Sequence, residues 1–147
     1  MSTSYALIAD PDLVAAHIYV SSVRALGLGT AVVRDGAVAL STMLERGAPK
    51  LLICELALPG LDGFELIEGL RRTAPEGETH VIAVSADRAL RDRAADARAR
   101  LGIGAIMARA ASEESVKRVI RRLVGVEDGS SGVSRARPAR TRAGRQP

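Results

Sequence analysis

Five polar residues stand at or just beyond the ends of apolar runs: Asp10, Asp12, Glu55, Ser85 and Arg109. They comprise three acids, a hydroxyl and a cation. Carboxylates at such positions can bind a metal ion or pair with a cation. Among them, Asp10 is the better metal-ligand candidate, whereas Asp12 suits the N-cap of a helix.

Glu55 is the unusual member of this set, because it is the lone acid in the apolar stretch LLICELAL. A carboxylate in such a place is costly to desolvate, or stays protonated, unless a cation meets it. Arg109 is the candidate cation, since its planar fork matches a carboxylate. We therefore expect a Glu55–Arg109 ion pair. The alternative is a strand-end acid that touches solvent.

The elements that must position these residues alternate along the chain. Short apolar runs predict strands at 5–9, 30–34, 50–58, 80–86 and 104–110. Helical spacing of apolar residues predicts helices at 12–27, 35–47, 62–72, about 87–100 and 112–125. Asp12 and Ser112 are expected N-caps, and Asp62 with Glu65 has the spacing of a capping box.

Strands that are apolar throughout and are each followed by a helix predict a five-stranded parallel sheet covered on both faces. With right-handed crossovers, this is a doubly wound α/β sandwich. Such sheets place their sites at the carboxyl ends of the strands. The polar residues above are therefore expected to share one pocket.

Composition excludes several classes of function. Of 147 residues, 47% are hydrophobic but only 2% are aromatic, which argues against flavin binding and base-stacking platforms. The only cysteine, Cys54, excludes an internal disulfide and predicts a buried core residue in a reduced, cytoplasmic setting. No run reaches the length of a membrane span, and the first residues do not resemble a signal peptide.

The basic charge of the chain is concentrated at its end. The net charge is +4, but residues 129–147 hold five arginines and no acid, which leaves 16 basic against 17 acidic residues elsewhere. We expect two parts: a folded domain over residues 1–125 and a disordered, Arg-rich tail over 126–147. The tail is a linker, an incidental end, or a nonspecific anchor for nucleic acid, an acidic partner or a membrane surface.

The chain resembles the receiver domains of two-component response regulators, which have a flavodoxin-like fold. The resemblance covers residues 4–125 and is carried by LIADPD, LLICELALPGLDGFELIEGLR, VIAVSA and LGIGAIMAR. In that family the third strand ends in a phosphoacceptor aspartate, an acidic pair after the first strand binds Mg²⁺, and a hydroxyl and a lysine end the fourth and fifth strands. The resemblance places Glu55 at the phosphoacceptor position, Ser85 at the hydroxyl and Arg109 at the lysine.

The departures from the family pattern fall on the chemistry itself. Glu55 is one methylene longer than the expected aspartate, and Pro11 replaces the second member of the acidic pair that Asp10 begins. Ala110 replaces a proline, and Ile106 stands where a mobile aromatic residue commonly reports activation. The resemblance thus implies a degenerate receiver that is not an enzyme and needs no cofactor, with Mg²⁺ at most weakly held. We expect Glu55 to imitate a phosphorylated aspartate by reaching Arg109 and Ser85.

The resemblance also implies where the domain would meet its partners. In receivers, the face made by the fourth helix, fifth strand and fifth helix docks signalling proteins or forms dimers. Four basic residues lie in the predicted fifth helix: Lys117, Arg118, Arg121 and Arg122. Two alternatives remain open: a working receiver that holds a metal through Asp10 or Asp12, and a nucleic-acid-associated regulator that binds through its tail.

Overall fold

The computed structural model describes residues 4–109 and 111–125. Five strands form one parallel sheet in the order β2-β1-β3-β4-β5. The strands are β1 (Tyr5–Ala9), β2 (Gly29–Val33), β3 (Leu51–Glu55), β4 (His80–Ser85) and β5 (Ala105–Ala108). The helices are α1 (Leu13–Arg24), α2 (Gly36–Arg46), α3 (Gly63–Arg71), α4 (Arg88–Asp96), α5 (Arg98–Leu101) and α6 (Glu113–Val124).

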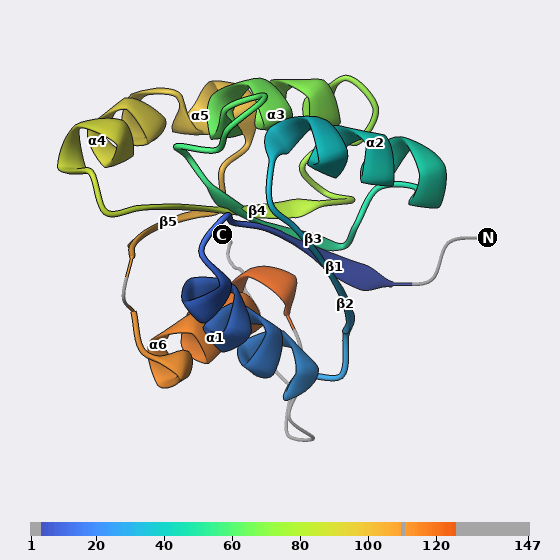
Figure 1. The fold of residues 1–147 in the computed structure, drawn as a ribbon, viewed down its shortest axis with the longest axis vertical. Helices are drawn as coiled ribbons and strands as arrows, with labels where there is room; N and C mark the ends of the chain where they lie inside the picture. The colour runs from blue at the N-terminus through green and yellow to red at the C-terminus, as the bar shows by residue number, and fades with distance from the viewer. Residues whose placement is uncertain (1–3, 110, 126–147) are drawn as a thin grey trace, which may run out of the picture.

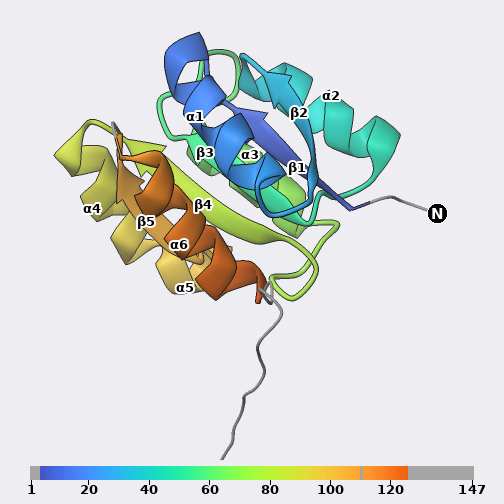
Figure 2. The ribbon, with the colours of Figure 1, turned by 90° about the horizontal axis from the view of Figure 1, so that it is seen from below.

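The sheet is the middle of three layers. Helices α2, α3, α4 and α5 cover one face, and α1 and α6 cover the other (Figure 1). Seen from below, α1 and α6 cross the sheet side by side (Figure 2). The predicted doubly wound α/β sandwich with a five-stranded parallel sheet is therefore confirmed.

The core is built from aliphatic side chains, as the shortage of aromatic residues requires. Strands β1, β3 and β4 are buried on both faces, with alternate residues packing into one core cluster under α2–α5 and another under α1 and α6. This is why their sequences are apolar without alternation. Cys54 lies in this core, fully buried and unpaired, as predicted.

Local capping fixes where the helices begin. Asp12 accepts hydrogen bonds from the N–H groups of Val14 and Ala15, and Ser112 accepts one from Ser115. Asp62 and Glu65 form the reciprocal capping box that their spacing predicts. These bonds satisfy N–H groups that have no partner inside the helix.

The single helix predicted over about 87–100 is wrong in one respect, because it divides at Ala97 into α4 and α5. Helix α4 contacts the core through the buried Ala94 and the partly buried Leu90, while Leu101 and Ile103 are buried further along. The break redirects the chain so that these larger side chains reach the core. Gly102 follows with a left-handed backbone (φ 65°) that suits glycine.

Helix α1 is buried through Ala15, Ala16, Tyr19 and Val23, whereas Leu13 at its start is 59% exposed. Among the described residues, no helix combines the length and apolar character needed to cross a membrane. Residues 126–147, predicted to form the Arg-rich tail, lie outside the described residues.

Candidate functional site

The candidate site lies at the carboxyl edge of the sheet, where parallel strands deliver their last residues. Asp10 follows β1, Glu55 ends β3 and Arg109 follows β5. Backbone bonds hold these ends in line: the Asp10 N–H donates to Val33 O (3.0 Å), and the Arg109 N–H donates to Ser85 O (3.3 Å). Arg109 starts two strands away from Glu55, so only a long side chain can bridge the gap.

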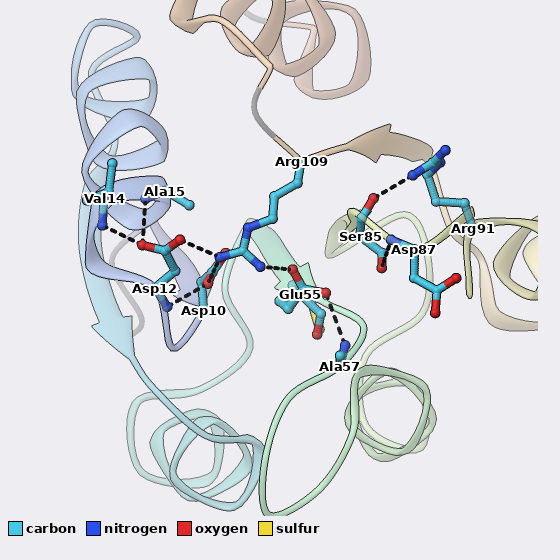
Figure 3. Close-up of polar contacts among 11 residues, drawn as sticks. Asp10, Asp12, Val14, Ala15, Glu55, Ala57, Ser85, Asp87, Arg91 and Arg109 are labelled. Carbon is cyan, nitrogen blue, oxygen red and sulfur yellow. Dashed lines mark hydrogen bonds and ion pairs between the residues drawn. The ribbon is translucent and has the colours of Figure 1, made fainter. Parts of the chain in front are cut away.

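The Arg109 guanidinium is the centre of the site (Figure 3). Its Nη1 donates to Glu55 Oε1 at 2.7 Å, and its Nη2 lies 2.9 Å from Asp12 Oδ2 and 3.2 Å from Asp10 Oδ1. The expected Glu55–Arg109 ion pair is thus present. From the sequence we expected both guanidinium nitrogens to bind one carboxylate, but they bind different ones. The guanidinium joins carboxylates from the ends of two neighbouring strands.

Glu55 is held firmly in this position. Its side chain is 3% exposed, so the alternative of an acid that touches solvent is wrong. Its second oxygen, Oε2, accepts a hydrogen bond from the Ala57 N–H at 3.1 Å. Directly after the strand, Gly63 at the start of α3 comes so close that a Cβ there would lie 2.8 Å from Glu55 O. Only glycine lets α3 begin against the strand end.

The two aspartates after β1 have different roles. Asp12 caps α1 through Oδ1 and meets Arg109 through Oδ2, so one residue serves both functions. Asp10 is 1% exposed, and its Oδ1 accepts from the Asp12 N–H at 2.8 Å and from Arg109. Its Oδ2 is buried and has no hydrogen-bond partner among the described residues. The site therefore contains one unsatisfied carboxylate oxygen.

Ser85 does not join the site as expected. Its Oγ accepts a hydrogen bond from the Asp87 N–H at 3.0 Å, and no hydrogen bond within the described residues joins it to Glu55. Figure 3 shows Ser85 facing the start of α4, apart from the Arg109 cluster. A hydroxyl two residues before an N-cap commonly makes this local turn, and the short-range bond prevails over the long-range one.

The charges of the site do not balance, because three carboxylates share one guanidinium. Burial raises the pKa of Asp10, and the carboxylates of Glu55 and Asp12 add to this effect; the Asp12 N–H and Arg109 oppose it. The N–H groups of Val14 and Ala15, together with Arg109, lower the pKa of Asp12. Desolvation lowers the pKa of Arg109, but Asp10, Glu55 and Asp12 together raise it above its ordinary value. The guanidinium is held charged.

These residues do not fit the Mg²⁺ ion that the family resemblance implies. Mg²⁺ needs near-octahedral oxygen ligands, but both oxygens of Glu55 and of Asp12 already accept hydrogen bonds. The second acid of the expected pair is Pro11, which leaves Oδ2 of Asp10 as the one free carboxylate oxygen. Within the described part of the chain, no cluster of three or more potential metal ligands occurs. Arg109 supplies the positive charge instead.

The residue predicted for the switch position and those predicted for partner docking lie away from the site. Ile106 is half-buried in β5 and packs against the core. Arg118, Arg121 and Arg122 are exposed on α6, whereas Lys117 is partly covered and pairs with Glu114 at 3.1 Å. Exposed cations are thus available on α6, but Lys117 contributes little to them.

Sequence reasoning missed two contacts of the site. It did not predict that Arg109 would also reach Asp10 and Asp12. The spacing of residues along the chain does not show how far an arginine side chain extends across the ends of neighbouring strands. It also missed Arg91, whose Nη1 donates to Ser85 O at 2.8 Å from the charged face of α4. No signal in the sequence separates Arg91 from the other arginines of that helix.

Comparison with known proteins identifies the family and agrees with the fold. The family model for the response regulator receiver domain matches residues 6–119. A response regulator receiver domain protein from Methanospirillum hungatei JF-1 has a TM-score of 0.72 and 18% identity, and the match covers 84% of this chain and 95% of that one. A signal receiver domain from Pseudomonas fluorescens Pf-5 also has a TM-score of 0.72, with 20% identity, and the match covers 85% of this chain and 89% of that one. The receiver domain of NtrX from Brucella abortus has a TM-score of 0.70 and 20% identity, and the match covers 83% of this chain and 99% of that one.

One curated protein matches over a shorter region. It is an uncharacterised 14.6 kDa protein from Leptolyngbya boryana, 55% identical over 38 residues. The match covers 26% of this chain, and the chain spans 28% of that protein's length. The solved structures support the fold, while the family model covers most of the chain. The chain belongs to the response regulator receiver domain family.

Proposed function

We propose that this receiver domain signals through protein–protein contact without being phosphorylated, and that it is not an enzyme in the turnover sense. The observation that carries the proposal is the Arg109 guanidinium, which joins Glu55 to Asp10 and Asp12. In this reading, a permanent internal ion pair replaces a transient phosphoryl group. Receivers act on partner signalling proteins, so the output is a surface that a partner recognises.

The state of Glu55 supports the proposal. Attack on a phosphoryl donor needs a carboxylate oxygen that is free and in line with the leaving group. Here Oε1 is bound by Arg109 and Oε2 by the Ala57 N–H. Phosphorylation would have to break at least one of these bonds, and the site has no ligand set suited to a metal ion that would neutralise the incoming charge.

The identity of the cation also supports it. A lysine is a flexible point charge, whereas an arginine fork can hold two carboxylates at once. Arg109 therefore ties the ends of β1, β3 and β5 together. Because Glu55 carries one negative charge where a phosphoryl group brings nearly two, the imitation of the phosphorylated state is partial.

The first experiment tests for phosphorylation. The full chain is incubated with acetyl phosphate and Mg²⁺ and examined by intact mass spectrometry, with a phosphorylatable receiver as a positive control. We expect no phosphoryl adduct. The Glu55→Asp variant should also remain unmodified because Pro11 is unchanged, while the combined Pro11→Asp, Glu55→Asp and Arg109→Lys variant is the one expected to gain the reaction. A stable adduct on Glu55 itself would refute the proposal.

The second experiment tests the output surface, which we assign to α4, β5 and α6. Reversing the charge of Arg118 and Arg122 should abolish partner capture in pull-downs and any self-association measured by sedimentation. A matched variant reverses two exposed arginines elsewhere, Arg24 and Arg72. Equal losses in the two variants would show that the effect is general charge and not this surface.

A further inference from the structure

An open pocket of about 700 Å³ lies beside the Arg109 cluster, on the outer side of Asp12. Its wall comes from α1, from the ends of β4 and β5, from α4 and from the segment before α6, and Asp12 and Arg109 of the cluster also line it. The apolar part includes Val14, Ile18, Ala108 and Ala111. The volume lies within the range of small-molecule sites, which is roughly 300–1,000 Å³.

Short side chains create this space. Ala86, Ala108 and Ala111 stand where the chain leaves β4, leaves β5 and approaches α6, and none of them extends beyond Cβ. Val14 lines the pocket and is 75% exposed. A bound apolar group would cover Val14 and gain hydrophobic free energy in proportion to the area removed from water.

The polar groups in the wall are mainly donors. Asp12 offers no unused oxygen, because Oδ1 caps α1 and Oδ2 accepts from Arg109. Arg91 uses Nη1 on Ser85 O, which leaves its other N–H groups without a partner among the described residues. Tyr19 also lines the pocket, and burial with the nearby charge of Asp10 raises its pKa to about 12, so its hydroxyl keeps its proton.

Charge narrows the choice of ligand. Three carboxylates surround Arg109. An anionic ligand placed in the pocket beside Arg109 would therefore be repelled by Asp10, Asp12 and Glu55. An ammonium group would meet two guanidinium groups in the wall, those of Arg91 and Arg109, and the one acid there, Asp12, is already paired with Arg109. A neutral oxygen acceptor suits the free N–H and O–H groups and carries no charge penalty.

We propose that this pocket binds a small uncharged organic molecule with an apolar body and a carbonyl-type oxygen. The apolar body lies against Val14, Ile18 and the alanines, and the oxygen accepts from Arg91 or Tyr19. The proposal does not depend on the phosphorylation-independent function, because the pocket lies beside the cluster and uses none of its paired oxygens.

The test compares three probes that share a phenyl group: 4-phenylbutan-2-one, 3-phenylpropanoate and 4-phenylbutan-1-amine. Each is titrated into the ¹⁵N-labelled full chain, and amide shifts are followed by NMR. We expect the ketone to shift the amides of Ala15, Tyr19, Ala86 and Ala111 and to bind about fivefold tighter than either charged probe, the effect of roughly one hydrogen bond.

Two variants locate the binding. Ala86→Leu fills the pocket and should weaken ketone binding at least fivefold, whereas Ala95→Leu changes an exposed alanine of α4 outside the pocket and should leave it unchanged. Tighter binding of either charged probe would overturn the ligand class. Shifts spread over other surfaces, shifts unaffected by Ala86→Leu, or no response to any probe would overturn the site.

Discussion

Two arginines of this domain each tie three groups together, at different places and with different partners. Arg71 donates only to backbone carbonyls: Leu101 O (2.9 Å), Gly102 O (2.8 Å) and Ala74 O (3.2 Å). The guanidinium of Arg109 instead pairs with three carboxylates, those of Asp10, Asp12 and Glu55. Desolvation lowers the pKa of Arg71, whereas the carboxylates around Arg109 raise its pKa despite desolvation.

The contrast separates a structural arginine from a site arginine. At Arg71, the hydrogen bonds of the cation go to neutral carbonyls and no carboxylate is crowded against another. Gly102 lets the guanidinium approach, since a Cβ there would lie 3.1 Å from Arg71 Nε. At Arg109, the partners carry excess negative charge, and one buried oxygen of Asp10 remains unpaired. A junction that served stability alone would not keep this imbalance.

The largest effect is expected for Arg109→Met. Removing the only cation leaves carboxylates buried without a partner, which costs about 3–5 kcal/mol in comparable pairs. Urea unfolding of the variant and the wild type at pH 7 and at pH 4.5 measures this loss in the free energy of unfolding. The loss should be smaller at the lower pH, because protonation of the abandoned acids relieves their repulsion. An equal loss at both pH values would contradict the assignment.

Arg71→Met should have the next largest effect. It removes charge-assisted hydrogen bonds to three carbonyls, and we expect a loss of about 2–3 kcal/mol. The same two unfolding experiments apply. The loss should change less with pH than it does for Arg109→Met, because the hydrogen-bond partners of Arg71 are backbone carbonyls and the charge of Glu76 acts on Arg71 without a hydrogen bond. A change with pH as large as that of Arg109→Met would contradict the distinction between the two arginines.

Asp10→Asn is expected to stabilise the domain at neutral pH, by about 1 kcal/mol, because it removes a buried charge with an unpaired oxygen. The folded pKa of Asp10 lies above its ordinary value, so the folded state holds the proton more firmly than the unfolded state does. The wild type should therefore lose stability as pH rises from about 4 through the folded pKa. The variant should lack this slope, and a retained slope would refute the assignment.

The smallest effect is expected for Asp12→Asn. The Asn oxygen still caps α1, so only the exposed contact with Arg109 is lost. The pKa of Asp12 is lowered in the folded state, so its contribution is present near neutrality and is lost as pH falls through the folded pKa. The midpoint temperature of thermal unfolding should be lower for Asp12→Ala than for Asp12→Asn, because alanine cannot cap α1. The reverse order would contradict the capping role.

Much of this architecture was predictable because its causes are local. Asp12, Asp62 and Ser112 cap their helices through bonds that span two or three residues. The apolar runs of β1, β3 and β4 predicted strands buried on both faces, and they are. The error at Ser85 has an equally local cause, because its hydroxyl accepts a hydrogen bond from the N–H two residues further on and makes none with Glu55 among the described residues.

The sequence by itself determined the strand–helix order, the caps and the need of Glu55 for a cation, because each follows from periodicity or from the cost of desolvating a charge. Only the tertiary structure decided how that need was met. The strand order sets how far Arg109 must reach, and its fork therefore spans Glu55, Asp10 and Asp12. The pocket beside it was likewise invisible, because it depends on three alanines from separate segments meeting at one edge of the sheet.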